Sequence, residues 1–299
     1  MVCKQGGVAN NAFGKTRRAA DAIVRCEHLE NAMGQSQVRY ENLEDHPFVK
    51  ASFSKAVEIA QKLQTGSITA VEAEYIREPD EYEFYVIQVG HTLAHLLHLC
   101  EQLVHAVLFL SSFTPTKRMR EAGITRAGHL QYNIENYLIR TQSVHDRVLK
   151  LVNAVFHLGL RPQDCRHDTI AKNLHVKSTG VPVRLQAMRK LLGKYRQDRN
   201  IIIHHETYQE DDLRELEMYY LAQKLDGDLE GGIQGRFLYV ARSLTREFVN
   251  QKMHEFDKFN GEIFRHLELL FDDLKPKYEA MTVSLRQKCG HETGPSGGE

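Results

Sequence analysis

The chain has 299 residues, of which 42% are hydrophobic, seven are proline and none is tryptophan. This composition can bury a sizeable core, and the long stretches without proline favour an all-α protein over a sheet protein. Because 39 basic residues balance 39 acidic ones, no overall charge marks the chain as a nucleic-acid binder. The five cysteines include no Cys-x-x-Cys pair, which argues against a zinc knuckle and a disulfide framework.

Apolar residues recur at helical spacing along most of the chain. The predicted helices cover about 15–41, 47–64, 81–113, 129–160, 181 to the adjacent histidines at 204 and 205, and 209–225. Pro115 and Gly123 break the connection over 114–128. A loop over about 161–180, with room for a short helix, precedes Pro182, which suits a first helical turn.

One long amphipathic helix is predicted over about 237–286, with Pro276 as the place where it would break. The expected organisation has four segments: an N-terminal helical extension over 1–80, a helical core over 81–225, a long C-terminal helix packed on the core over 236–286, and a disordered tail over 287–299. The N-terminus has no apolar stretch of signal-peptide length, and His105 interrupts the longest apolar run. These features predict a cytoplasmic protein without membrane contact.

The segment from Asp198 to Glu206 carries the strongest chemical signal, because it places Arg199 five positions before His204. Arginine presents a planar fork of donors that matches phosphate oxygens, and histidine takes and gives protons near neutral pH. Five places in the chain have a His at a similar distance after an Arg, so the spacing alone is weak. Only Arg199 is followed by Asn, three isoleucines and two adjacent histidines.

Apolar residues at steps of three and four lead into this segment and predict the inward face of an amphipathic helix: Leu185, Met188, Leu192 and Tyr195. The next step falls on Arg199, where a core residue would be expected. Two interpretations stay open: a functional guanidinium, or a long stem that reaches water or pairs with a carboxylate at the end of the helix. Six basic residues line the approach and would attract a polyanion: Arg184, Arg189, Lys190, Lys194, Arg196 and Arg199.

The run from Arg199 to His204 resembles the Arg, polar residue, three residues, His signature of the HEPN superfamily, and 131–160 resembles the long helix that precedes it in stand-alone bacterial members. The resemblance covers about 81–225 and implies an all-α, HEPN-like helical bundle with additional N- and C-terminal helices. It also implies a metal-independent ribonuclease with Arg199 and His204 as the catalytic pair. Asn200 would orient a histidine or a phosphate, and His205 would be a helper or a neighbour on the helix.

The resemblance also implies the partners. HEPN proteins generally form homodimers in which two Arg and two His converge in one cleft, and some act as toxins or in defence with an antitoxin or regulatory protein. RNA is the expected substrate, with no cofactor and no metal. One departure matters: paired toxins of this type carry a tyrosine two residues after the motif histidine, where this chain has Glu206. Regulation by nucleotide addition to that tyrosine is therefore not implied.

Other patterns compete with this interpretation. Four histidines lie on one face of a predicted helix and would suit a metal: His91, His95, His98 and His105. No carboxylate pattern accompanies them, so a polar seam or a partner-facing surface is preferred. The pair His167-Asp168 and the nearby Cys165 are weaker signals for a metal-dependent hydrolase and a thiol nucleophile. A non-catalytic HEPN-like scaffold that binds RNA, a nucleotide or a protein stays the main alternative.

Overall fold

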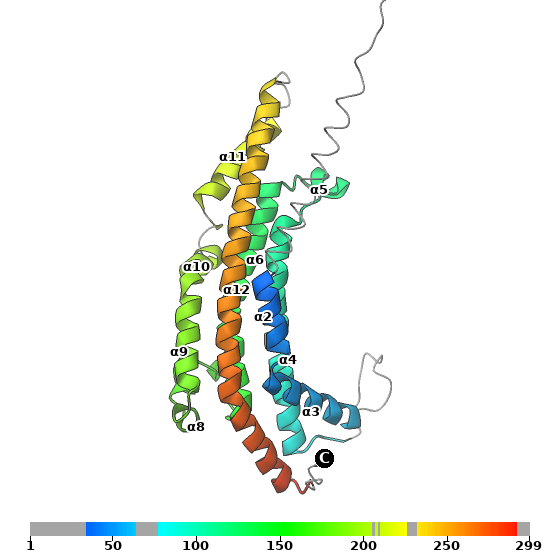
Figure 1. Ribbon diagram of the computed structural model, residues 1–299, viewed down its shortest axis with the longest axis vertical. Coiled ribbons are helices and arrows are strands. Elements are labelled where there is room, and N and C mark those ends of the chain that lie inside the picture. The colour runs from blue at the N-terminus through cyan, green and yellow to red at the C-terminus, as the bar shows by residue number, and fades with distance from the viewer. Residues whose placement is uncertain (1–33, 64–76, 205–206, 209, 226–231, 292–299) are drawn as a thin grey trace, which may run out of the picture.

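All regular elements that the computed structural model describes are helices, which confirms the predicted all-α class (Figure 1). The structure describes residues 34–63, 77–204, 207–208, 210–225 and 232–291. In chain order the α-helices are α2 Gly34–Glu44, α3 Pro47–Leu63, α4 Glu81–Ser111, α5 Lys117–Glu121, α6 Arg126–Val155, α7 His167–Ala171, α8 Leu174–Lys177, α9 Val181–Leu192, α10 Arg196–His204, α11 Asp211–Leu225 and α12 Gly232–Lys288. The 3₁₀ turns η1 Pro162–Asp164 and η2 Gly193–Tyr195 lie between them.

Three long helices, α4, α6 and α12, run along the length of the molecule (Figure 1). α4 packs against α6 and α12, α2 and α3 cover one side, and α9 to α11 cover the other. Gly90 of α4 allows α3 to come close, because a Cβ atom at this position would lie 2.6 Å from the Cβ of Ala56. The bundle therefore presents α9 and α10 on an outer face, supported by α6 and α12.

Capping residues fix where the two central helices begin. At the start of α4 the Asp80 side chain accepts a hydrogen bond from the backbone N–H of Glu83, and the Glu83 carboxylate accepts one from the backbone N–H of Asp80. This reciprocal arrangement satisfies two amides that the helix itself leaves unpaired. The Thr125 side chain caps α6 in the same general way. The predicted start of α4 at residue 81 is confirmed, whereas α6 begins at Arg126 and not at the predicted residue 129.

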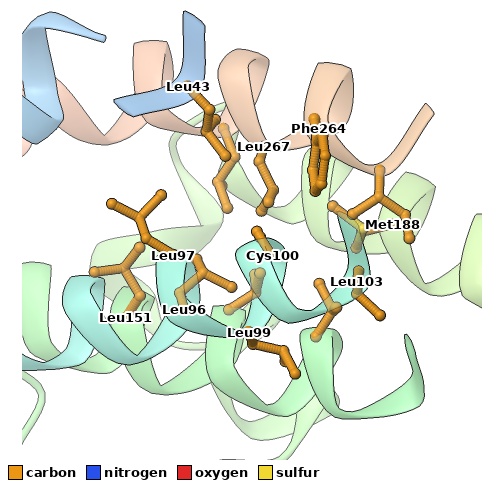
Figure 2. Packing of buried hydrophobic residues seen from close by; sticks show 14 of the residues in the cluster. Leu43, Leu96, Leu97, Leu99, Cys100, Leu103, Leu151, Met188, Phe264 and Leu267 are labelled. Atoms are coloured by element: carbon orange, nitrogen blue, oxygen red, sulfur yellow. The ribbon is translucent and has the colours of Figure 1, made fainter. Parts of the chain in front are cut away.

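The core lies where α4 meets α12 and α6 (Figure 2). Cys100 of α4 is fully buried facing α12, and burial raises the pKa of its thiol, so it behaves as an apolar residue. Tyr137 of α6 stacks on Phe256 of α12 with ring centroids 3.8 Å apart. The Tyr137 hydroxyl donates to Oδ1 of buried Asn260 at 2.9 Å, so its polar end is satisfied inside the core.

α12 is longer than predicted and continues through Pro276 without a break. Proline removes one backbone donor and crowds the preceding turn, so it bends a helix more readily than it ends one when the flanking turns are well packed. The C-terminal end of α12 leans away from the line of its earlier turns (Figure 1). Leu274 and Tyr278, on either side of Pro276, are fully buried, and this packing holds the helix together across the proline.

Two other predictions are corrected by the structure. The connection over 114–128 contains the short helix α5, which Thr116 caps through its side chain, and α6 begins before the connection was expected to end. The loop over 161–180 contains η1, α7 and α8 rather than one short helix. The predicted N-terminal helix is seen only from Gly34 onward, and the parts predicted over 15–33 and in the glycine-rich tail lie outside the described residues.

By length and composition alone, α4 is long and apolar enough to span a membrane. Just over half of its most apolar stretch, 56%, is buried inside the fold. The central helix of a helical bundle has the same composition because it is surrounded by other helices. Contacts with α3, α6 and α12 cover the buried part of this apolar stretch.

Candidate functional site

The helix that carries the motif is interrupted, which corrects the prediction of one helix from Val181 to the histidines. α9 ends at Leu192, η2 follows, and α10 begins at Arg196. The side chain of Gln142 donates from Nε2 to the carbonyl oxygen of Leu192 at 2.6 Å, so a residue of α6 occupies an acceptor that a continuous α-helix would use. Gly193 adds to this because glycine has a low helix propensity.

The inward face predicted for this region is confirmed, since Leu185, Met188, Leu192 and Tyr195 are all buried. Arg199 is partly buried at the next step, and its Nη1 donates to Oδ1 of Asn200 at 3.2 Å. Among the described residues Arg199 forms no salt bridge. The interpretation of Arg199 as the partner of a carboxylate is therefore not supported within this part of the chain, and its guanidinium keeps donors for another group.

Arg199 and His204 lie in the same unbroken helix, α10. Five residues correspond to about 140° of rotation and about 7.5 Å of rise, so the two side chains leave the helix in different directions. The interruption at η2 precedes both residues and does not bring them together. His204 is exposed at the C-terminal end of α10. His205 and Glu206 lie outside the described residues.

α10 contacts α6 and has little apolar surface buried against the core. Ile202 is partly buried and packs against the hydrophobic core, whereas Ile203 is 42% exposed beside His204. A helix of this kind has little apolar burial of its own. The position of α10 consequently depends on polar contacts that the segments just before and after it make with α12 and α6.

The N-terminal end of α10 is tied to α12 by Glu255. Its Oε1 accepts a hydrogen bond from the Tyr195 hydroxyl at 2.5 Å and lies 3.0 Å from Lys194 Nζ. Although partial burial opposes ionisation, these partners together with Lys252 lower the pKa of Glu255 to about 2. Glu255 therefore stays ionised under all ordinary conditions and holds the turn before α10.

The segment after α10 is tied to the same place by Lys252, which is only 5% exposed. Its Nζ lies 2.8 Å from Glu210 Oε1 and 3.1 Å from Glu255 Oε2. Burial lowers the pKa of Lys252, but the two carboxylates outweigh it and the net shift is upward. The Tyr208 hydroxyl donates to Glu210 at 2.9 Å, and the Tyr208 backbone N–H donates to Glu135 of α6 at 2.8 Å. We call Lys252, Glu255, Glu210 and Tyr208 the Lys252 cluster.

The basic approach to the motif divides into two groups in the structure. Arg184 pairs with Asp273 of α12 at 2.9 Å and Lys194 pairs with Glu255, so both charges are neutralised within the fold. Arg189, Lys190 and Arg196 form no salt bridge with any described residue. The unneutralised positive charge is thus concentrated on the outer face of α9 and α10, beside Arg199.

Two histidines that the sequence did not connect meet on this same face. Nε2 of His145 in α6 lies 3.2 Å from Nδ1 of His167 in α7, and their rings are stacked with centroids 5.3 Å apart. Burial and then the neighbouring His167 lower the pKa of His145 to about 4, Asp146 opposes them, and Arg189 and Arg196 add smaller lowering effects. The two residues are 22 positions apart on different helices, so helical spacing gave no signal for this contact.

The row of histidines on α4 is exposed and does not form a metal centre among the described residues. His91 and His95 contact each other at 3.0 Å between Nε2 atoms, and His98 contacts Glu101 and Gln102. The described residues contain one group of three metal-ligand side chains, namely Asp80, Glu83 and His291. Asp80 and Glu83 already serve as the cap of α4, and Glu83 also binds Arg77 at 2.6 Å.

The bundle is all-α, and Arg199, Asn200 and His204 lie in its helix α10, in agreement with the expected resemblance to HEPN domains. The family model described as HEPN_Cthe2314-like HEPN matches residues 39–275, which is well over half of the chain. The protein belongs to this family. No curated protein and no solved structure matches the chain. Membership places the protein in a superfamily of nuclease and RNA-related domains, and the matched stretch contains the whole of α9 and α10.

Proposed function

We propose that this protein is a metal-independent endoribonuclease in which Arg199 and His204 act on the phosphodiester bond. The observation that carries the proposal is the combination of HEPN family membership with an Arg199 side chain that has no carboxylate partner among the described residues. An arginine neutralised by a carboxylate would bind phosphate poorly, whereas Arg199 keeps its charge for a ligand. His204 lies exposed at the end of the same helix.

The chemistry uses only groups of the protein and of the RNA. The 2′-hydroxyl attacks the adjacent phosphorus, a histidine takes the hydroxyl proton, and the 5′-oxygen leaves with a proton from an acid. Arg199 stabilises the charge that builds on the five-coordinate phosphate. The products are a 2′,3′-cyclic phosphate and a 5′-hydroxyl. Asn200, which already contacts Arg199, would hold the guanidinium in its orientation.

A second copy of the chain completes the proposed site. Because Arg199 and His204 leave α10 about 140° apart, one copy does not direct both side chains at one phosphate. A homodimer that pairs two α10 helices would bring two Arg and two His together and supply separate acid and base groups. Ile203, exposed between these residues on α10, offers apolar surface for such a contact. We expect light scattering to give a dimer at micromolar concentration, and a monomer that cleaves RNA would contradict the shared site.

The test is cleavage of a labelled RNA strand in EDTA by the wild type and by Arg199→Ala and His204→Ala. Each substitution should lower the rate at least about a hundredfold, because one acid–base or charge-stabilising group typically contributes that much. His205→Ala should matter less. Arg118→Ala in α5 and His175→Ala in α8 are matched controls, since both residues are exposed and lie away from α10. Circular dichroism verifies that each variant stays helical.

The substrate and the products separate this proposal from its rivals. A 2′-O-methyl strand or an all-DNA strand should resist cleavage, and mass spectrometry should detect cyclic phosphate ends. Fragments with 3′-hydroxyl and 5′-phosphate ends, together with loss of activity in EDTA, would indicate metal-assisted attack by water and direct attention to His91, His95 and His98. RNA binding without any cleavage would identify the protein as a scaffold. Wild-type cleavage by both folded variants would mean that the site lies elsewhere.

A further inference from the structure

The contact between His145 and His167 is the strongest unexplained polar feature beside α10. Each ring uses one nitrogen in the 3.2 Å contact, so one imidazole donates and the other accepts, and both rings cannot be protonated in this arrangement. The rings are stacked at an interplanar angle of 25° and both residues are partly buried. Such a pair keeps its hydrogen bond when both rings are neutral, and protonation of both rings would break that bond.

The register of the helices brings Arg189 to this pair. Gln142 contacts Leu192, and Glu135 contacts Tyr208, so α6 runs antiparallel to the path of α9 and α10. One turn further along α6 lies His145, and one turn back along α9 lies Arg189. α7, which carries His167, packs against both α6 and α9. His145, His167 and Arg189 therefore meet at one place on the outer face.

Two arginines and two aspartates lie near the two rings, and the arginines have no salt-bridge partner among the described residues. The charged groups near the two rings are Arg189 from α9, Arg196 from α10, and the exposed Asp146 and Asp168 that follow each histidine in the chain. Neither arginine forms a salt bridge within the described part of the protein. The same arginines contribute to lowering the pKa of His145, and Arg189 to lowering that of His167. A bound anion would add a direct partner for these arginines, which the exposed aspartates do not provide.

The nature of the site favours phosphate over a metal ion. Two imidazole nitrogens 3.2 Å apart could chelate a metal, but two arginines close by would repel a cation. Arginine instead offers a fork of donors to phosphate oxygens, and a protonated imidazole adds a charged donor. Oxygens of a phosphodiester accept all of these hydrogen bonds.

We propose that His145, His167 and Arg189 form a phosphodiester-binding subsite that holds the same RNA strand that Arg199 contacts. The identity of the ligand as RNA rests on the proposed function. Arg189 precedes Arg199 by ten residues, which is about 15 Å along the helical path. At the rise of about 3.4 Å per nucleotide in a stacked strand, the two points are about four nucleotides apart. The outer face of α9 and α10 would then bind a short single strand across both positions.

The experiment measures binding of a labelled ten-nucleotide 2′-O-methyl RNA by fluorescence anisotropy in EDTA, from pH 5.5 to 8 at constant ionic strength. Arg189→Gln should raise the dissociation constant at least about fivefold. Wild-type affinity should rise severalfold as the pH falls from 7.5 to 5.5, because a bound phosphate favours a protonated ring. His145→Gln and His167→Gln should remove most of that dependence. Lys50→Gln, at an exposed lysine of α3 on the opposite side of the bundle from α9, is the matched control and should change affinity less than twofold.

A second measurement guards against variants that fail to fold. Proton NMR of the histidine rings in the wild-type protein should show two resonances that move when the RNA is added and whose pKa rises in the complex. Resonances that do not move, or equal affinity of Arg189→Gln and wild type at every pH, would overturn the subsite. Zinc that binds tightly to the protein and is lost in both His145→Gln and His167→Gln would also overturn it, in favour of a metal site.

Cleavage of unmodified RNA, measured in parallel, separates this proposal from the one on which it rests. If cleavage depends on Arg199 while Arg189→Gln leaves binding unchanged, the nuclease proposal stands and the subsite is wrong. If Arg189→Gln weakens binding but the wild type cuts no RNA, the subsite stands as part of an RNA-binding surface and the nuclease proposal is wrong.

Discussion

Two polar clusters lie close to α10, and they differ in how their charges are paired. In the Lys252 cluster one buried ammonium group lies within 3.1 Å of two carboxylates, and tyrosine hydroxyls complete the contacts. Around His145 and His167, two arginines lie near two imidazoles and no described carboxylate forms a salt bridge with either arginine. The first cluster pairs its charges directly within the fold, whereas the arginines of the second have no direct carboxylate partner among the described residues.

This difference distinguishes a structural site from a binding site. A buried charge with its partners in place resists change, because removal of one partner leaves the others unpaired in a poorly solvated environment. A group of unneutralised cations on an outer face costs stability, and that cost is recovered when an anion binds. We therefore expect substitutions in the Lys252 cluster to change mainly stability, and substitutions around His145 to change mainly ligand binding.

The largest effect is expected from Lys252→Met. Loss of the ammonium group leaves Glu210 and Glu255 close together without their shared cation, which should lower the free energy of unfolding by about 3 kcal/mol. Urea unfolding followed by circular dichroism measures it. Lys258→Met, an exposed lysine of α12, is the control and should cost less than about 0.5 kcal/mol. Equal decreases in the free energy of unfolding for the two variants would show that the buried ion pairs of Lys252 contribute no more to stability than an exposed lysine does.

A smaller effect should appear at low pH and report on Glu255. Its pKa is about 2 in the folded protein against 4.5 ordinarily, so the unfolded chain binds the proton first as the pH falls. The associated stability is fully present above about pH 4.5 and should decline by about 2 kcal/mol between pH 4.5 and 2, after allowance for partial exposure. Glu255→Gln should flatten this part of a plot of unfolding free energy against pH. An unchanged slope would contradict the assignment.

The smallest effect should appear at a higher pH and report on His145. Its pKa is lowered from 6.5 to about 4, so the unfolded chain again binds the proton first. Stability should fall by about 1 kcal/mol between pH 6.5 and 4, because the ring is only partly shielded from water. His145→Gln should remove this decline and leave the one below pH 4.5 intact. Two separate pH ranges for the two clusters would confirm that they act independently, and a single shared transition would refute it.

Much of the fold could be predicted from the sequence, because apolar residues at helical spacing mark the long amphipathic helices. The central helices and the buried face that leads to Arg199 were predicted from spacing, and the all-α class from composition and the long stretches without proline. The break at η2 was not, since it depends on Gln142 of another helix reaching the Leu192 carbonyl. Neither was the contact of His145 with His167 nor the pairing of Lys252 with Glu210. Such contacts join distant parts of the chain, and only the packing of the bundle determines them.

The position of α12 in the chain has a consequence for how the protein is made. Lys252 and Glu255, which hold both ends of α10, are synthesised after it, and Asp257 of α12 contacts Ser36, 221 residues earlier. Contacts this distant in sequence form late, because the chain must first close a large loop. A nascent chain that has completed α10 therefore has its contacts with α6 but still lacks the α12 residues that help to fix it. The proposed ribonuclease helix reaches its final position only after α12 has left the ribosome, so a partly made chain should be inactive toward the RNA around it.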